Sequence, residues 1–155
     1  KTEFICAYAI AFCILGTIQA VIAGLASIYI FGLETGGKTV AVIGIAILDS
    51  ILGTALGLLA SSLARTEFQA VQFMPVVLIP QFLLGGFIVP RDSLPSFLNF
   101  LSDLMPLSYS VDALSEVFRQ GTNLHSGYMN NVLVVLLISV IALALGGLTL
   151  RRSSK

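Results

Sequence analysis

An acidic residue inside an apolar stretch is the first feature of this sequence that could do chemistry. Of the eight acidic and eight basic residues, only Asp49 falls within one of four long apolar stretches. Within a membrane, a carboxylate costs a few kcal/mol and tends to face a bundle interior or an aqueous cavity. Asp49 could therefore contact a substrate, ion or proton in a transport path, or it could form a hydrogen-bonded lock between helices.

Two glutamines accompany Asp49 as candidates for the same transport path or interhelical lock. Gln19 lies in the preceding apolar stretch, and a hairpin of these two stretches would place both side chains near mid-depth, so Gln19 is the expected partner of Asp49. Gln81 lies in the third stretch. Gln69 and Gln72, near the inner end of that third stretch, are more typical of interfacial or packing positions.

Two other patterns suggest enzyme chemistry, and neither has the context it needs. Residues 32–39 fit the phosphate-binding pattern G-x-x-x-x-G-K-[ST], but that motif requires a preceding strand and a soluble α/β domain. Apolar stretches flank it here, so we interpret it as a Gly-rich turn. His125 has no second His or Cys at ligand spacing and no organised Ser or Asp partner. The sequence therefore predicts no metal site, no catalytic residues and no enzyme.

The composition indicates a membrane protein. The chain has 155 residues, 57% of them hydrophobic and 10% charged, with a mean hydropathy of +0.99. A soluble domain carries about 25% charged residues, and about 20 apolar residues in a helix cross a bilayer. We expect an all-α membrane protein, a single transmembrane domain over residues 1–155. Its four transmembrane helices are expected at about 4–33, 39–64, 68–89 and 132–150. The net charge of zero argues against a nucleic-acid partner.

Small residues indicate where these helices pack. Gly16, Ala20 and Gly24 have the small-xxx-small spacing that lets a second helix approach closely, and small residues continue along the 39–64 stretch. Because the polar turn at 34–38 is short, the first two stretches are expected to form an antiparallel hairpin.

The third stretch and the segment after it are less regular. Pro75 and Pro80 remove backbone donors and are expected to bend the third helix. Residues 93–105 and 107–119, separated by Pro106, have apolar residues on one face and polar residues on the other. They predict two short amphipathic helices, each too short to cross a bilayer and suited to a shallow or re-entrant position before the last span.

The distribution of basic residues predicts the orientation. Cytoplasmic loops carry an excess of Lys and Arg, and an arrangement with both ends in the cytoplasm gives five basic residues inside against three outside. Those inside are Lys1, Arg65, Arg151, Arg152 and Lys155, and those outside are Lys38, Arg91 and Arg119.

Motifs between residues 61 and 119 resemble one transporter family. They are SSLART at 61–66, LGGFIVP at 84–90, LP at 94–95, MPLSY at 105–109 and VDAL at 111–114. As a set, they resemble the permease subunits of type-2 ABC exporters, the group that includes the daunorubicin-resistance drug and lipid exporters. Met105 and Ser108 replace commoner residues of the family's turn, although the spacing is kept.

The resemblance implies that the chain is the C-terminal part of a permease, spans three to six of six, in keeping with its start at Lys1 without an initiator Met. It also implies roles for three groups of residues. Lys1, Thr2 and Glu3 would end a cytoplasmic coupling helix; Pro75, Pro80, Gly85 and Gly86 would form a deformable outer section of span five; Pro90, Pro95, Pro106, Tyr109 and Asp112 would belong to an extracellular re-entrant pair.

The function implied by the resemblance is export. Two permease copies would pair in the plasma membrane, among its lipids, and cytoplasmic ATPase subunits would hold ATP and Mg and drive alternating access. The cargo would be a hydrophobic drug, lipid or related small molecule, and this chain itself would bind no cofactor. The alternative is a stand-alone four-helix membrane protein, either a drug/proton antiporter with Asp49 as the coupling acid or a membrane scaffold.

Overall fold

The computed structural model describes residues 2–36, 38–64, 66–119 and 126–152. Over these ranges the chain forms six α-helices and one 3₁₀ turn and has no strand, which confirms the expected all-helical class. The elements are α1 (Thr2–Tyr29), α2 (Thr39–Leu63), α3 (Glu67–Leu84), the 3₁₀ turn η1 (Arg91–Ser93), α4 (Ser96–Asp103), α5 (Pro106–Arg119) and α6 (Ser126–Arg152).

Four of the described helices are long and apolar enough to cross a membrane, as the sequence predicts. These candidate spans are Ala7–Tyr29, Thr39–Leu63, Glu67–Leu84 and Gly127–Gly147. Large apolar side chains cover their outer surfaces, among them Ile10, Leu15 and Val71. A soluble protein rarely exposes so large and continuous an apolar surface, so the bundle is suited to lipid.

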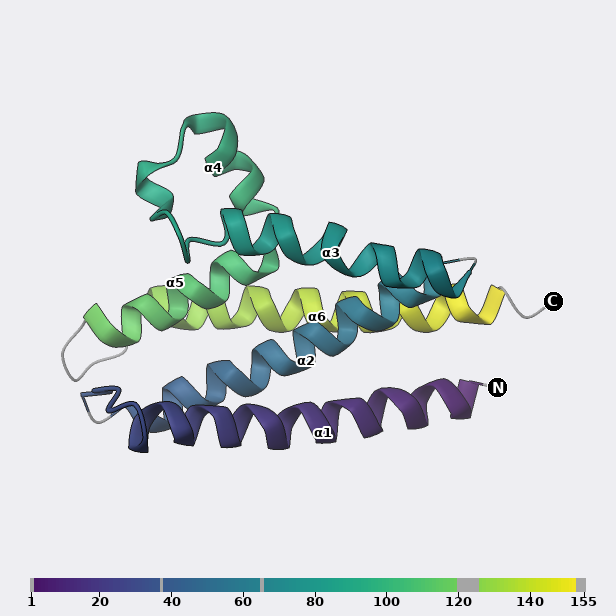
Figure 1. Ribbon diagram of the computed structural model, residues 1–155, viewed down its shortest axis with the longest axis horizontal. Coiled ribbons are helices and arrows are strands. Elements are labelled where there is room, and N and C mark those ends of the chain that lie inside the picture. Colours follow the sequence, from purple (N-terminus) through teal and green to yellow (C-terminus); the bar gives the residue numbers. More distant parts are fainter. Residues whose placement is uncertain (1, 37, 65, 120–125, 153–155) are drawn as a thin grey trace.

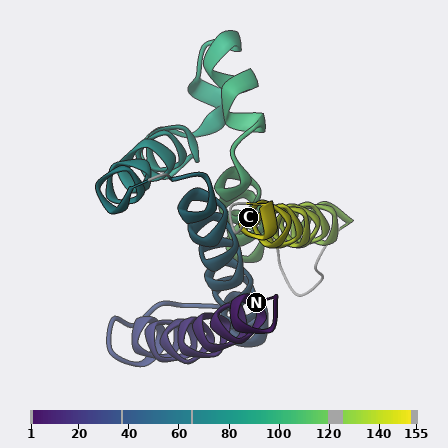
Figure 2. The ribbon, with the colours of Figure 1, turned by 90° about the vertical axis from the view of Figure 1, so that its right-hand side faces the viewer.

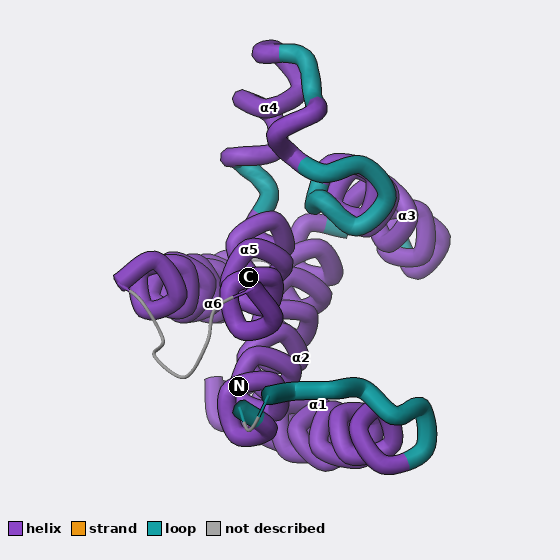
Figure 3. Tube along the Cα trace, turned by 90° about the vertical axis from the view of Figure 1, so that its left-hand side faces the viewer, coloured by secondary structure: helices purple, strands orange, loops and turns teal. Residues whose placement is uncertain are grey.

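The bundle is arranged around α2. Figure 1 shows α2 and α6 crossing at its centre, with α1 and α3 running along the two sides of α2. The end-on views place α1 and α3 on opposite sides of α2, with α6 on a third side (Figures 2 and 3). The described N-terminal and C-terminal ends lie at the same end of the bundle (Figure 1). The short helix α4 projects away from the other helices.

Helices α2 and α6 bring their backbones together at Gly146. A side-chain carbon built on Gly146 would lie 3.4 Å from the backbone nitrogen of Leu59, in van der Waals contact, so a large side chain there would collide with α2. Close by, the hydroxyl oxygens of Ser62 and Thr149 are 2.6 Å apart and form a hydrogen bond. In lipid, where apolar surfaces gain nothing by meeting each other, close packing and hydrogen bonds of this kind hold helices together.

The small-residue faces of α1 and α2 serve two purposes. Gly16 lies directly against the hydroxyl of Ser50, and Gly24 is buried against Ile43, so the expected close approach of the hairpin is confirmed at these positions. Gly53 and Gly57, by contrast, have no atom within 4 Å of where a side chain would begin. Small residues there leave space instead of filling it.

Helix α3 is continuous through Pro75 and Pro80 and ends at Leu84, earlier than the expected residue 89. It begins after Thr66, whose hydroxyl accepts a hydrogen bond from the Gln69 nitrogen at 3.1 Å. Its end is caused by Gly86, whose φ of +87° is in the left-handed region that favours glycine. The chain bends there, and the ring of Phe87 stacks on that of Phe82 with centroids 5.8 Å apart.

Helix α5 packs antiparallel along the first half of α2. Ala113 and Val117 of α5 form a buried cluster with Val42 and Ile45 of α2. At the end of this contact, the Lys38 Nζ donates to the carbonyl oxygen of Val117 at 2.9 Å. The two expected short helices are therefore present, and α5 extends from the start of α2 to its middle.

The contact at Gly146 can be tested with its neighbour. Replacing Gly146 with Leu should lower the free energy of unfolding in detergent by about 1–3 kcal/mol, because overpacking forces α2 and α6 apart. Gly147, next to it on the same helix, has no atom within 4 Å of where the first side-chain carbon would lie, so Gly147→Leu is the matched control. Denaturant titration followed by circular dichroism would measure both; equal effects would contradict this account of the α2–α6 contact.

Candidate functional site

Asp49 lies at the middle of α2 and is half-buried. Its Oδ1 accepts a hydrogen bond from the hydroxyl of Ser110, a buried residue of α5. The expected partner, Gln19, lies instead on α1 among exposed residues. The carboxylate thus joins α2 to α5. Ser110 was not predicted as its partner, because nothing local in the sequence shows that α5 folds back against α2.

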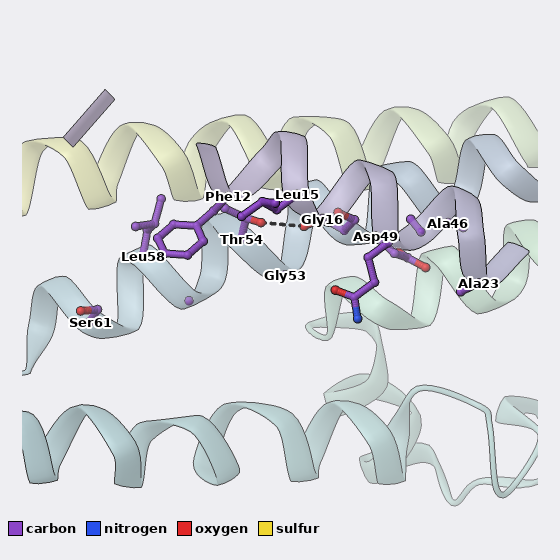
Figure 4. A pocket seen from close by; sticks show the side chains of 14 residues that line it. Phe12, Leu15, Gly16, Ala23, Ala46, Asp49, Gly53, Thr54, Leu58 and Ser61 are labelled. Atoms are coloured by element: carbon purple, nitrogen blue, oxygen red, sulfur yellow. Dashed lines mark hydrogen bonds between the residues drawn. The ribbon is translucent and has the colours of Figure 1, made fainter. Parts of the chain in front are cut away.

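An outer groove runs between α1 and α2, with a volume of about 950 Å³. Gln19 and Asp49 both line it, so the two residues share a space without forming the expected pair. Figure 4 shows Asp49 among the lining residues of this groove. Its lining also includes the hydroxyl residues Ser50, Thr54 and Ser61; Thr54 Oγ1 donates to the Ser50 carbonyl oxygen at 2.9 Å. The groove therefore combines apolar walls with a row of polar side chains on α2.

A second space, the inner cavity, lies beside the outer groove, between α2, α3 and the start of α5. It has a volume of about 460 Å³ and is lined by Asp49, Leu52, Gly53, Leu56, Gly57, Ala60, Ser61, Ala70, Met74, Val77, Leu78, Gln81 and Leu107. Gln81 is 5% exposed, and its Nε2 donates to the Val77 carbonyl oxygen at 3.1 Å. The structure thus brings the candidates Asp49 and Gln81 to the same cavity.

Asp49 lines both spaces, and so do Gly53, Gly57 and Ser61. Because these four residues follow one another at four-residue spacing, the outer groove and the inner cavity meet along one stripe of α2. Of the three residues expected in a transport path, Gln19 is in the outer groove, Gln81 is in the inner cavity, and Asp49 belongs to both.

An ion-pair cluster, which was not predicted from the sequence, organises the segment between α3 and α6. The guanidinium of Arg91 pairs with Asp103 of α4 and Asp112 of α5, and it lies 5.9 Å from the centre of the Tyr109 ring. Tyr109 in turn donates from its hydroxyl to the Asp103 carbonyl oxygen at 2.8 Å. The Arg91 side chain is only 15% exposed. The sequence feature that could have indicated this cluster is the basic Arg91, followed by Asp103 and Asp112 in the two amphipathic helices.

Two serines fasten the same segment to α3. Ser102 donates to the carbonyl oxygen of Leu84, the last residue of α3, at 2.7 Å, and its hydroxyl lies 3.1 Å from that of Ser108. Both serines are fully buried. Tyr109 and Asp112, expected in the extracellular motif, therefore belong to a connected set of polar contacts.

The prolines and glycines of the expected motifs have clear local roles. Pro90 precedes η1, Pro95 precedes α4 and Pro106 is the first residue of α5. Proline is favoured at helix starts because it lacks a donor that would have no partner there. Gly85 and Gly86 directly follow α3.

Other predicted positions lie at the edge of the described residues or beyond it. Lys1 and His125 lie outside them, and Thr2 and Glu3 are the first residues of α1. The segment resembling a phosphate-binding loop follows a helix, α1, rather than a strand, and its Lys38 holds α5 through Val117.

Comparison with known proteins identifies the family. Residues 1–118 match the family described as ABC-2 type transporter, and the chain belongs to it. The resemblance seen in the sequence motifs is confirmed.

Three curated relatives have sequences similar to this chain. The probable multidrug ABC transporter permease YbhS of Escherichia coli is 28% identical over 92% of this chain and 36% of its own length. The linearmycin resistance permease protein LnrN of Bacillus subtilis is 24% identical over 78% of the chain and 31% of its own length. ABC transporter G family member 20 of Dictyostelium discoideum is 26% identical over 70% of the chain and 15% of its own length. The chain thus spans about a third of the first of these relatives. No solved structure matches it.

The Arg91 cluster predicts that one side chain holds α4 and α5 together. Arg91→Gln removes both ion pairs and should weaken this segment by about 1–3 kcal/mol, since each lost bond is to a charged group. Arg91→Lys keeps the charge but lacks the guanidinium fork that contacts two carboxylates at once, so an intermediate effect is expected. Hydrogen exchange of residues 91–112 would measure both variants. If exchange in α4 is the same in Arg91→Gln as in the wild type, the cluster does not fasten this helix.

Proposed function

We propose that this chain is the membrane-spanning part of a permease in an ATP-driven ABC exporter. The observation that carries the proposal is the family membership over residues 1–118, together with four candidate spans. The names of the relatives from Escherichia coli and Bacillus subtilis, a probable multidrug permease and a linearmycin resistance permease, favour a hydrophobic drug, a lipid or a related molecule as cargo. Hydrolysis of ATP, with Mg, would take place in a separate cytoplasmic ATPase subunit.

The proposed orientation has both described ends of the chain in the cytoplasm and the turn between α1 and α2 outside the plasma membrane. The two ends lie at the same end of the bundle, as four spans require (Figure 1). The basic Arg151 and Arg152 at the end of α6 favour the cytoplasm at that side.

In this orientation α4 and α5 would be the extracellular re-entrant pair. Two contacts support this for α5: Lys38 bonds to Val117 at the outer end of α2, and Ser110 bonds to Asp49 at its middle. Helix α5 would therefore run about half the depth of the membrane and no further. Helix α3 ends near this level, since its Gln81 and α5's Leu107 line the same cavity as Asp49.

The proposed mechanism is alternating access. ATP binding would close the ATPase pair, and Lys1, Thr2 and Glu3 would continue from the coupling helix that transmits the motion to α1. Pro75 and Pro80 each leave a carbonyl of α3 without its usual helical donor, and Gly85 and Gly86 follow, so the outer part of α3 would be the section that deforms. A second permease copy would complete the path, in which Gln19, Asp49 and Gln81 would be the polar residues.

The first experiment expresses the complete permease together with its candidate ATPase. Co-purification of the two, and export into inverted vesicles that requires ATP and Mg, are the expected results. Export driven by a pH gradient without the ATPase would contradict the proposal and would favour the alternative, a drug/proton antiporter in which Asp49 is the coupling acid.

The role of the prolines gives a second test. The double substitution Pro75→Ala and Pro80→Ala restores two backbone hydrogen bonds and stiffens α3, so ATP-driven export should fall severalfold while co-purification with the ATPase persists. Val76→Ala, an exposed position between the two prolines, is the control. Export at the wild-type rate in the double variant would show that the prolines are not part of the moving section.

A further inference from the structure

The inner cavity has an unusual charge distribution for a space within a membrane. Asp49 is its one ionisable lining residue, and all of the lining residues lie in the described part of the chain. Most of the wall is aliphatic, formed by side chains such as Leu52, Leu56 and Leu78. A carboxylate facing such a wall must take up a proton or meet a cation, because an unpaired charge is costly where water is scarce.

The described part of the chain supplies no cation to this carboxylate. Arg91 binds Asp103 and Asp112. Lys38 lies eleven residues before Asp49 on α2, about 16 Å along the axis, and holds the Val117 carbonyl oxygen. Ser110 gives Asp49 a neutral hydrogen bond only. That bond fixes the position of the carboxylate at one end of the cavity without cancelling its charge.

We propose that the inner cavity binds a hydrophobic monocation, whose positive charge is attracted by Asp49 and whose apolar groups fill the space between α2 and α3. The volume of about 460 Å³ is within the range of small-molecule sites, about 300–1,000 Å³. A single carboxylate selects a single positive charge. The lining includes no aromatic ring, so the charge is recognised by Asp49 and not by a cation–π contact.

The rest of the lining suits a variable apolar body. Met74 has a flexible thioether, and Gly53 and Gly57 leave space beside the helix backbone. The buried amide of Gln81 also lines this cavity.

The inference rests on the proposed export function and deepens it by naming a class of cargo. It can be tested without ATP.

The test uses two ions of equal size and opposite charge. Tetraphenylphosphonium and tetraphenylborate are titrated onto the complete permease with its ATPase in lipid nanodiscs, and uptake by empty nanodiscs is subtracted. We expect saturable binding of the cation only. Asp49→Asn, which keeps the hydrogen bond from Ser110, should weaken cation binding at least about tenfold. Glu34→Gln, which replaces an exposed loop carboxylate, should leave it unchanged.

A second pair of variants tells the inner cavity from the outer groove, since Asp49 lines both. Ala70 lines the inner cavity alone and Ala23 the outer groove alone. Ala70→Phe should abolish cation binding, and Ala23→Phe should leave it intact. Equal binding of the two ions, wild-type cation binding by Asp49→Asn, or loss of binding in Ala23→Phe with retention in Ala70→Phe would each overturn the inference. Because these measurements involve no ATP, they can fail while ATP-driven export is upheld, and the reverse.

Discussion

The contact between α2 and α6 is the one on which the positions of the other helices depend. Lipid gives helices no hydrophobic reason to associate, so a bundle in lipid is held where backbones approach closely or polar groups meet. Both occur here, at Gly146 against Leu59 and at the hydrogen bond between Ser62 and Thr149. With α6 fixed along one side, α2 presents its remaining faces to α1, α3 and α5. Asp49 lies on α2, Gln19 lines the groove between α1 and α2, and Gln81 lines the cavity between α2 and α3.

A second constraint explains why α3 and α5 are placed as they are. Backbone groups within a bilayer must find partners inside the protein, and the proposed orientation places the end of α3 near the middle of the membrane. The carbonyl oxygen of Leu84, the last residue of α3, accepts a hydrogen bond from the buried Ser102, and Gly86 takes a left-handed backbone conformation. Arg91 then binds α4 to α5 through Asp103 and Asp112. Polar side chains within the segment thus bind its helices to each other and to the end of α3.

Local composition was sufficient to predict one group of features. The four spans and the two short amphipathic helices follow from hydropathy and periodicity. Helix α3 ends before the predicted residue 89, because Phe87, Ile88 and Val89 continue the apolar run beyond the helix. Hydropathy does not detect the left-handed backbone conformation at Gly86.

Features that depend on distant contacts could not be predicted in this way. The pairing of Asp49 with Ser110 joins positions 61 residues apart, and it needs the packing of α5 on α2, which no local pattern encodes. The role of Gly53 and Gly57 could not be predicted either. Their spacing is typical of a helix-packing face, and a glycine that packs against a helix cannot be told from one that lines a cavity by its position in the sequence.

The absence of side chains at Gly53 and Gly57 has a consequence for how such a protein could change its specificity during evolution. Both glycines border the outer groove and the inner cavity, so a larger residue at either position would narrow the two spaces together. A substitution at either glycine would therefore change two binding spaces at once. Independent adjustment has to come from residues that line one space alone, such as Ala23 for the groove and Ala70 for the cavity.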